Sequence, residues 1–137
     1  LAAARVGCLI ADPRVVAALR RVQAPYPVPE PCTLAALQAL RPEVQSKTRA
    51  AAQATCRERE GLRLALSDCP GVRAIHASQA NFLLVECRDA GRFFAASKSA
   101  GLIVRDFSSY PGLANCLRIS IGTPEQNQRL LAAVEQP

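Results

Sequence analysis

The sequence predicts an α/β fold, in which a small, mostly antiparallel sheet has helices packed on one face. Over the second half of the chain, apolar residues follow strand or helix periods in the order strand, strand, helix, strand, strand, helix. The 137 residues suffice for a domain with a sizeable core. No apolar run reaches the roughly 18 residues that a membrane helix needs.

The N-terminal part is predicted to hold a strand, a helix and a linker. Residues 6–10 are apolar and end at turn residues, as expected of a short buried strand. Asp12 is the predicted N-cap and Pro13 the first residue of a helix that ends near Val22. Residues 24–31 contain four prolines, which excludes a helix there and predicts an extended linker between two parts of the molecule.

Two helices and two strands are predicted after the linker. The helices span residues 32–40 and, opened by Pro42, residues 43–67. The strands span residues 72–76 and 81–87, with a polar turn between them.

The last third of the chain is predicted to hold a helix, two strands and a final helix. Residues 89–100 form an amphipathic helix that ends at Gly101. Short strands follow at residues 103–105 and 117–121. A Thr-Pro-Glu-Gln capping sequence then opens a helix over residues 125–135.

Two arginines stand at the ends of apolar runs in these last strands. Arg105 and Arg118 are joined by a turn-rich loop that includes residues 108–112. Strand alternation places Arg118 on the face opposite Leu117 and Ile119, so it avoids the core. Guanidinium groups bind carboxylates and phosphates through paired donors. We therefore expect the two side chains to form an anion clamp.

Composition argues against several other classes of protein. The net charge of +6 comes from fifteen dispersed arginines and two lysines, without the interleaved aromatics of a nucleic-acid-binding surface. Six widely spaced cysteines and one histidine predict no metal site. No secretory leader is visible, so we expect reduced cysteines acting as small hydrophobes in a cytoplasmic protein. The chain lacks Met and starts within an apolar pattern, so we expect it to be part of a longer protein.

Several segments together carry a family resemblance. They are Leu-Ala-Ala-Ala-Arg-Val-Gly at residues 1–7, Pro-Tyr-Pro-Val at 25–28, Asn-Phe-Leu-Leu at 81–84, Arg-Asp-Phe at 105–107, Pro-Gly-Leu at 111–113, Cys-Leu-Arg-Ile at 116–119 and Gly-Thr at 122–123. This set resembles the C-terminal part of fold-type I aminotransferases that use pyridoxal 5′-phosphate (PLP), and the histidinol-phosphate aminotransferases most closely. The resemblance covers essentially the whole chain.

The resemblance implies roles for three arginines. Arg5 would help to hold the phosphate of PLP. Arg118 would bind the anionic group of the substrate, which is the carboxylate of glutamate or the phosphate of histidinol phosphate. Arg105 would assist at the distal anionic group.

The resemblance also implies that this chain holds no catalytic residue. The family's Schiff-base lysine would lie upstream of Leu1, and neither Lys47 nor Lys98 matches it in position. The chain alone is therefore expected to be inactive. Its sequence departs from the family at Ala3, where the family has glycine, and at Ala4, where a larger apolar residue is usual.

The resemblance further implies the domain organisation and the reaction. Residues 1–31 would be the tail of a large PLP-binding domain with its linker, and residues 32–137 the C-terminal small domain. The complete enzyme would be a homodimer that transfers an amino group between histidinol phosphate and 2-oxoglutarate in histidine biosynthesis. The rest of the large domain would be the partner of this chain, and neither nucleic acid nor membrane is expected.

Other interpretations stay open at this point. Arg105 could pair with Asp106 at the surface, and Arg5 could only cap the end of a strand. The complete protein could be a threonine-phosphate decarboxylase of cobalamin synthesis, or the chain a non-catalytic basic binding module. The sequence does not assign roles to three further residues, Tyr26, Asn81 and His76.

Overall fold

The computed structural model describes residues 4–135; the first three residues of the matching segment at 1–7 lie outside them. The described part holds five helices and four strands. By their contacts the residues form two compact units, Leu1–Ala50 and Ala51–Pro137. The division falls inside α3 (Pro42–Ser67). The boundary expected at residues 31 and 32 stays a prediction. Among residues 4–135, none of the helices combines the length and apolar character needed to span a bilayer.

The first unit contains α1 (Pro13–Val22) and α2 (Glu30–Ala39). The prediction for α1 is confirmed, because the Asp12 carboxylate caps the helix by accepting from the Arg14 N–H at 2.8 Å. The extended linker is shorter than predicted. Pro31 lies in the first turn of α2. Proline is tolerated there because the N–H groups of the first turn have no intrahelical partner.

The strand predicted at residues 6–10 is wrong. These residues have no strand pairing, and Leu9 and Ile10 are 61% and 94% exposed. A strand requires a hydrogen-bonded neighbour, and no other segment of residues 4–135 pairs with this one. Cys8, which we expected to be buried as a small hydrophobe, is exposed for the same reason.

The second unit is built on a four-stranded sheet in the order β1-β2-β4-β3, with every neighbouring pair antiparallel. Its strands are β1 (Val72–Ile75), β2 (Phe82–Cys87), β3 (Arg105–Asp106) and β4 (Cys116–Ser120). In β2, Leu83, Val85 and Cys87 are fully buried and the residues between them are half-buried. One face of the sheet is therefore the core face, as the alternation predicted.

The strand predicted at residues 103–105 is displaced. The paired residues are only Arg105 and Asp106, and the preceding residues connect them to α4 (Ala90–Ser99) without strand pairing. Gly101 takes φ +71 after the helix, as expected of a C′ glycine. Leu102 and Val104 then pack against the core instead of pairing with β4, while Ile103 is 86% exposed.

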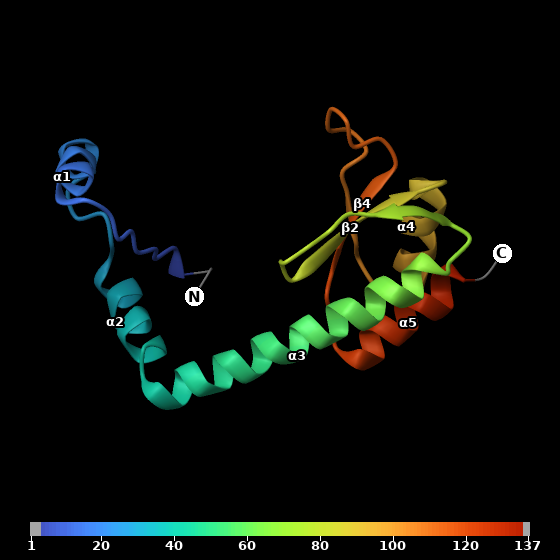
Figure 1. The fold of residues 1–137 in the computed structure, drawn as a ribbon, viewed down its shortest axis with the longest axis horizontal. Coiled ribbons are helices and arrows are strands. Elements are labelled where there is room, and N and C mark those ends of the chain that lie inside the picture. The colour runs from blue at the N-terminus through green and yellow to red at the C-terminus, as the bar shows by residue number, and fades with distance from the viewer. Residues whose placement is uncertain (1–3, 136–137) are drawn as a thin grey trace. The chain divides into compact units, whose positions relative to one another are not determined.

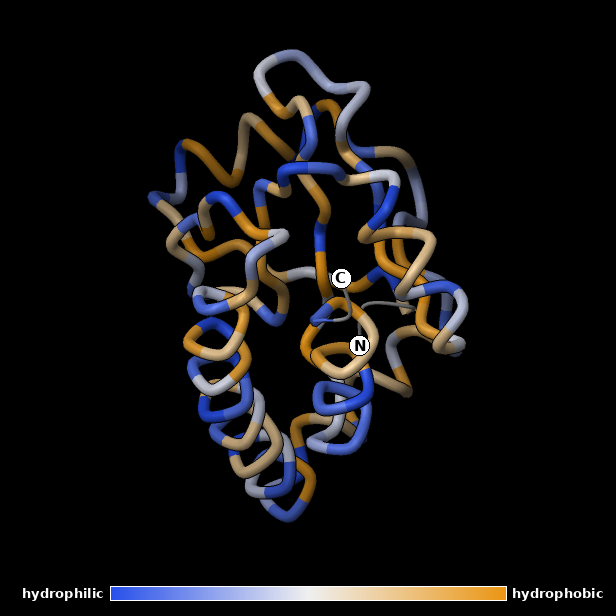
Figure 2. Tube along the Cα trace, turned by 90° about the vertical axis from the view of Figure 1, so that its right-hand side faces the viewer, coloured by the Kyte–Doolittle hydropathy of each residue, from blue (hydrophilic) through white to orange (hydrophobic). Residues whose placement is uncertain are grey.

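Helices cover the core face of the sheet (Figure 1), which confirms the predicted α/β fold. Leu62 and Leu66 of α3, Phe93 of α4 and Leu130 of α5 (Pro124–Val134) pack with the buried strand residues. The capping box predicted for α5 is confirmed by the reciprocal hydrogen bonds of Thr123 and Gln126. Figure 2 shows the alternation of apolar and polar residues around the helical turns that this packing requires.

Candidate anion-binding site

The sheet brings the two predicted substrate-binding arginines together. Arg105 of β3 lies directly opposite Arg118 of β4, and Arg118 lies opposite Leu84 of β2. Arg118 therefore points to the open face, away from the neighbouring core residues Leu117 and Ile119. Residues directly opposite in an antiparallel pair have Cβ atoms about 4.5–5.5 Å apart. Two positive charges are thus adjacent on the uncovered face of the sheet.

Aromatic rings hold both guanidinium groups. The Arg118 guanidinium carbon is 5.3 Å from the ring centroid of Phe82 and 5.7 Å from that of Phe107. The Arg105 guanidinium carbon is 5.6 Å from the same Phe107 ring. Tyr110 meets this ring edge to face, with centroids 5.1 Å apart and planes at 84°. Phe107 is therefore shared by both arginines.

The loop between β3 and β4 fixes the position of Phe107. The Phe107 N–H donates to Cys116 O at 2.9 Å, which extends the β3–β4 ladder by one residue. Phe107 O in turn accepts from the Tyr110 N–H at 2.9 Å, so residues 107–110 form a turn. The Tyr110 ring contacts the Phe107 ring within this turn. The loop of residues 107–115 projects beyond the sheet (Figure 1). It supplies ring surface to the arginines without adding a charge of its own.

No carboxylate neutralises the arginine pair within residues 4–135. None of the ion pairs found there includes Arg105 or Arg118. The surface ion pair between Arg105 and Asp106 does not form. Instead, Asp106 Oδ1 accepts from the backbone N–H of Ser108 at 2.7 Å. The two guanidinium groups are thus available to an external anion.

Both buried polar side-chain atoms that lack a partner in the described residues lie at this site. They are Arg118 Nε and Ser108 Oγ. The terminal nitrogens of Arg118 also make no hydrogen bond to a described residue, but they are not among the fully buried atoms. Arg118 therefore has free, accessible donors only at the tip of its side chain.

The predicted cofactor-binding arginine belongs to the first unit. Arg5 is exposed, has φ +52 and forms no ion pair with any residue from 4 to 135. A left-handed backbone is uncommon for a residue with a Cβ atom and is found most often at turns and functional sites. Because residues 6–10 form no strand, the alternative that Arg5 caps a strand end does not hold in the described part.

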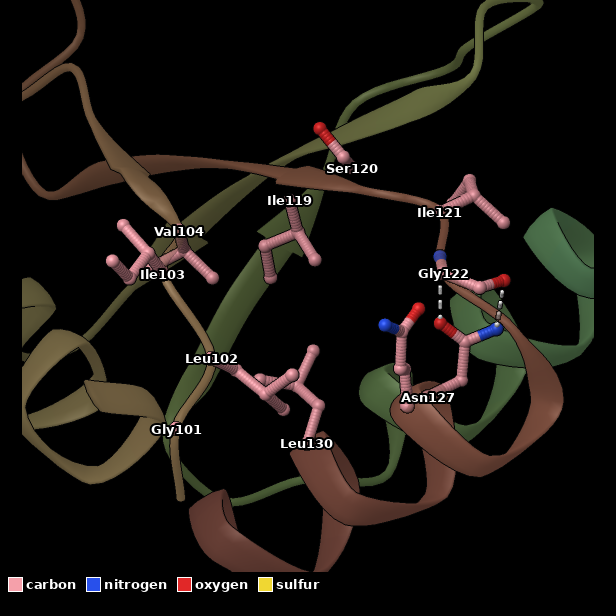
Figure 3. Close-up of a pocket in the computed structure, with 11 residues that line it drawn as sticks. Gly101, Leu102, Ile103, Val104, Ile119, Ser120, Ile121, Gly122, Asn127 and Leu130 are labelled. Atoms are coloured by element: carbon pink, nitrogen blue, oxygen red, sulfur yellow. Dashed lines mark hydrogen bonds between the residues drawn. The ribbon is translucent and has the colours of Figure 1, made fainter. Parts of the chain in front are cut away.

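A cavity of about 350 Å³ lies near the arginine pair but is a separate feature. It opens where the segment before β3 and the end of β4 diverge (Figure 3), and it has Ile119 and Leu130 of the core among its lining. Its lining contains no charged residue, so it offers neither an acid nor a base. Within its lining, the Asn127 side chain accepts a hydrogen bond from the N–H of Gly122 at 3.0 Å and donates one to the C=O of Gly122 at 3.4 Å.

Asn127 also ties the end of β4 to α3. Its amide donates to the Glu58 carboxylate at 2.9 Å, and the residue is buried, at 6% exposure. A Cβ atom on Gly122 would stand 2.9 Å from Cβ of Gln126, which is too close for any other residue without a shift. The strand that carries Arg118 is thereby fixed at its C-terminal end.

Sequence reasoning did not assign Phe82 and Phe107, the aromatic residues of the site. Both could have been found from the sequence, because each lies in a segment that carries the family resemblance.

The three residues to which the sequence assigned no role have different surroundings in the structure. The Asn81 carbonyl accepts from the Ile121 N–H at 2.9 Å, the His76 N–H donates to Leu84 O at 3.0 Å, and Tyr26 is 96% exposed.

Known proteins resemble this chain in sequence and in fold. The histidinol-phosphate aminotransferase of Stenotrophomonas maltophilia (strain R551-3) is 50% identical over 134 residues, 98% of this chain and 37% of that protein. The structure of the histidinol-phosphate aminotransferase from Clostridium acetobutylicum has a TM-score of 0.76 at 17% identity, and covers 89% of this chain and 37% of that one. The L-threonine-O-3-phosphate decarboxylase from Porphyromonas gingivalis has a TM-score of 0.71 at 22% identity, covering 92% and 39%.

The two structural likenesses establish a shared fold, while the sequence relative indicates closer kinship. The chain spans 37% of the length of that relative, so it corresponds to part of such a protein. The sequence model of the family Aminotransferase class I and II matches residues 1–134, which is nearly all of the chain. This chain belongs to the aminotransferase class I and II family.

Proposed function

We propose that this chain supplies the substrate-anion site of a histidinol-phosphate aminotransferase. The complete enzyme would transfer an amino group between histidinol phosphate and 2-oxoglutarate, forming imidazole-acetol phosphate and glutamate. The observation that carries the proposal is the Arg105–Arg118 pair, which lies on the open face of the sheet with no carboxylate partner. The 50% identity with the Stenotrophomonas maltophilia enzyme supports the choice of substrate.

The pair suits a reaction in which two different substrates use one site in turn. Glutamate brings carboxylates and histidinol phosphate brings a phosphate. A guanidinium group offers its donors to both anions with the same planar geometry. Arg118 is assigned to the anionic group of either substrate, and Arg105 to the distal anion beside it.

The residues present also fit the expected cofactor, PLP. Arg5 is assigned to its phosphate because the side chain is exposed and unpaired among the described residues. When bound, PLP supplies the electron sink that stabilises negative charge on the substrate carbon. Orientation of the substrate by its anionic end is the contribution of this chain.

No lysine of this chain is assigned to the chemistry. Lys98 lies in the last turn of α4, on the helix-covered side of the sheet, whereas the arginine pair lies on the open side. Lys47 lies in α3 and is exposed. We therefore expect this chain alone to bind anions but not to transaminate. Homodimerisation and a cytoplasmic location of the complete enzyme stay predictions from the resemblance.

A chimaeric enzyme tests the proposal. This chain would replace the matching 37% of the Stenotrophomonas maltophilia aminotransferase, and amino transfer from glutamate to imidazole-acetol phosphate would be measured. We expect activity in the chimaera and none in the chain alone. Arg118→Ala should lower kcat/KM by about 10- to 100-fold, because a charge-assisted hydrogen bond is lost.

Arg73→Ala is the matched control. Arg73 lies on β1 of the same sheet and is paired with Glu86 at 3.1 Å, so its loss should leave kcat/KM unchanged. An Arg118→Ala chimaera as active as the parent would refute the assignment. Release of carbon dioxide from threonine phosphate, with no amino transfer, would move the function to a decarboxylase.

A further inference from the structure

We propose that Phe82 and Phe107 are positioning residues that clamp Arg118 between their rings, so that only its terminal nitrogens receive the anion, while Phe107 also holds Arg105 beside it. This inference rests on the proposed function and deepens it. It names the residues that set how the anionic group is gripped. Neither ring needs to touch the substrate.

An aromatic ring from each side of β4 contacts the guanidinium group of Arg118. Phe82 comes from β2 and Phe107 from the residue after β3, and β4 with Arg118 lies between those strands. The two ring centroids are 5.3 and 5.7 Å from the guanidinium carbon. Cation–π attraction on both sides restricts a side chain that would otherwise sample many rotamers. The guanidinium is thus placed before any ligand arrives.

The Nε atom of Arg118 is buried. A guanidinium can grip an anion side-on, with Nε and one terminal nitrogen, or end-on, with both terminal nitrogens. Arg118 Nε is fully buried and has no partner among the described residues, so it is closed to an external ligand. The end-on grip is the one that this arrangement leaves available. The anionic group must therefore lie beyond the tip of the side chain.

Arg105 and Arg118 place two like charges side by side. Like charges directly opposite on neighbouring strands repel, and no carboxylate of residues 4–135 offsets Arg105 and Arg118. The negative face of the Phe107 ring is close to both guanidinium carbons, at 5.6 and 5.7 Å. The ring lowers the cost of keeping the two charges adjacent until an anion binds.

The experiment uses the whole 137-residue chain, with inorganic phosphate as the probe. Nitrogen-15 NMR would follow the Nε–H signal of Arg118, assigned by its absence in Arg118→Lys. We expect this proton to exchange slowly with water and to stay protected when phosphate binds. Phe107→Leu and Phe82→Leu should remove the protection and raise the Kd for phosphate by about three- to tenfold.

Two further variants separate positioning from a general loss of packing. Phe94→Leu removes an aromatic ring that packs against the core from α4, and it should lower stability without changing the Kd or the Arg118 signal. Phe107→Tyr keeps the ring and should restore both readouts. If Phe107→Leu and Phe82→Leu leave exchange and Kd as in the parent chain, the clamp is refuted.

The outcomes also separate this inference from the proposed function. A parent chain that binds no phosphate, yet protects Arg118 Nε–H in a manner that depends on Phe107, would support the clamp and count against the anion site. Phosphate binding that needs Arg118 but is indifferent to both rings would support the anion site and overturn the clamp.

Discussion

The two units of this chain are stabilised in different ways. In the second unit, residues from Leu62 to Leu130 supply the entire buried core of the described part. In the first unit, no described residue is buried, and Leu9, Ile10, Val22 and Leu40 expose large apolar surfaces. Its helices depend on local signals such as the Asp12 cap and the prolines at their starts. The difference shows that local signals suffice to define helices, whereas a core requires segments that are distant in sequence.

Amide hydrogen exchange should show the largest difference between the units. The second unit opens through loss of its core, while isolated helices of 10 residues, such as α1, are marginal in water. We expect amides of β2 and β4 to exchange at least about a thousandfold more slowly than those of α1. Equal protection in both units would contradict the comparison and indicate that the first unit is stabilised by packing.

Cysteine reactivity should differ almost as much. Burial raises the pKa of the Cys87 thiol to about 12, and only the thiolate reacts with alkylating reagents. Cys8 in the first unit is exposed. At pH 8, iodoacetamide should modify Cys8 within minutes and leave Cys87 intact until the protein unfolds, as followed by peptide mass spectrometry. Rapid modification of Cys87 in the folded chain would show that the core opens readily.

Truncation of a core residue should be far more costly than truncation of an exposed one. Leu117 is fully buried in β4, and Leu37 of α2 is 59% exposed. Leu117→Ala should lower the free energy of unfolding by about 2–5 kcal/mol, because it removes packing and leaves a cavity. Leu37→Ala, the matched control, should change it by less than about 0.5 kcal/mol. Urea unfolding of both variants measures the difference, and similar costs would contradict it.

Loss of a helix cap should give the smallest effect. Thr123 caps α5, which packs on the core, and Asp12 caps α1, which has no buried residue. Thr123→Ala should lower the free energy of unfolding of the second unit by about 1 kcal/mol. Asp12→Ala should leave that transition unchanged and reduce only the helicity of α1, measured by circular dichroism. A shift of the main transition by Asp12→Ala would mean that the two units unfold together.

Helix limits and strand faces were predictable because their signals act over a few residues. The start of α1 at Pro13 and the capping box of α5 follow from side chains that bond to their own helix. The alternation in β4 placed Leu117 in the core and Arg118 on the open face. Local residue patterns were thus sufficient to predict the helices, the core face and the arginines of the candidate site.

Strand pairing and the surroundings of the arginines became visible only in the folded chain. Residues 6–10 look like a strand but pair with nothing in the described part, and β3 contains two residues because Leu102 and Val104 pack into the core. The rings of Phe82 and Phe107 meet Arg118 through cross-strand register, which links positions far apart in the chain. Pairing, register and burial depend on such distant partners, and no local pattern of residues specifies them.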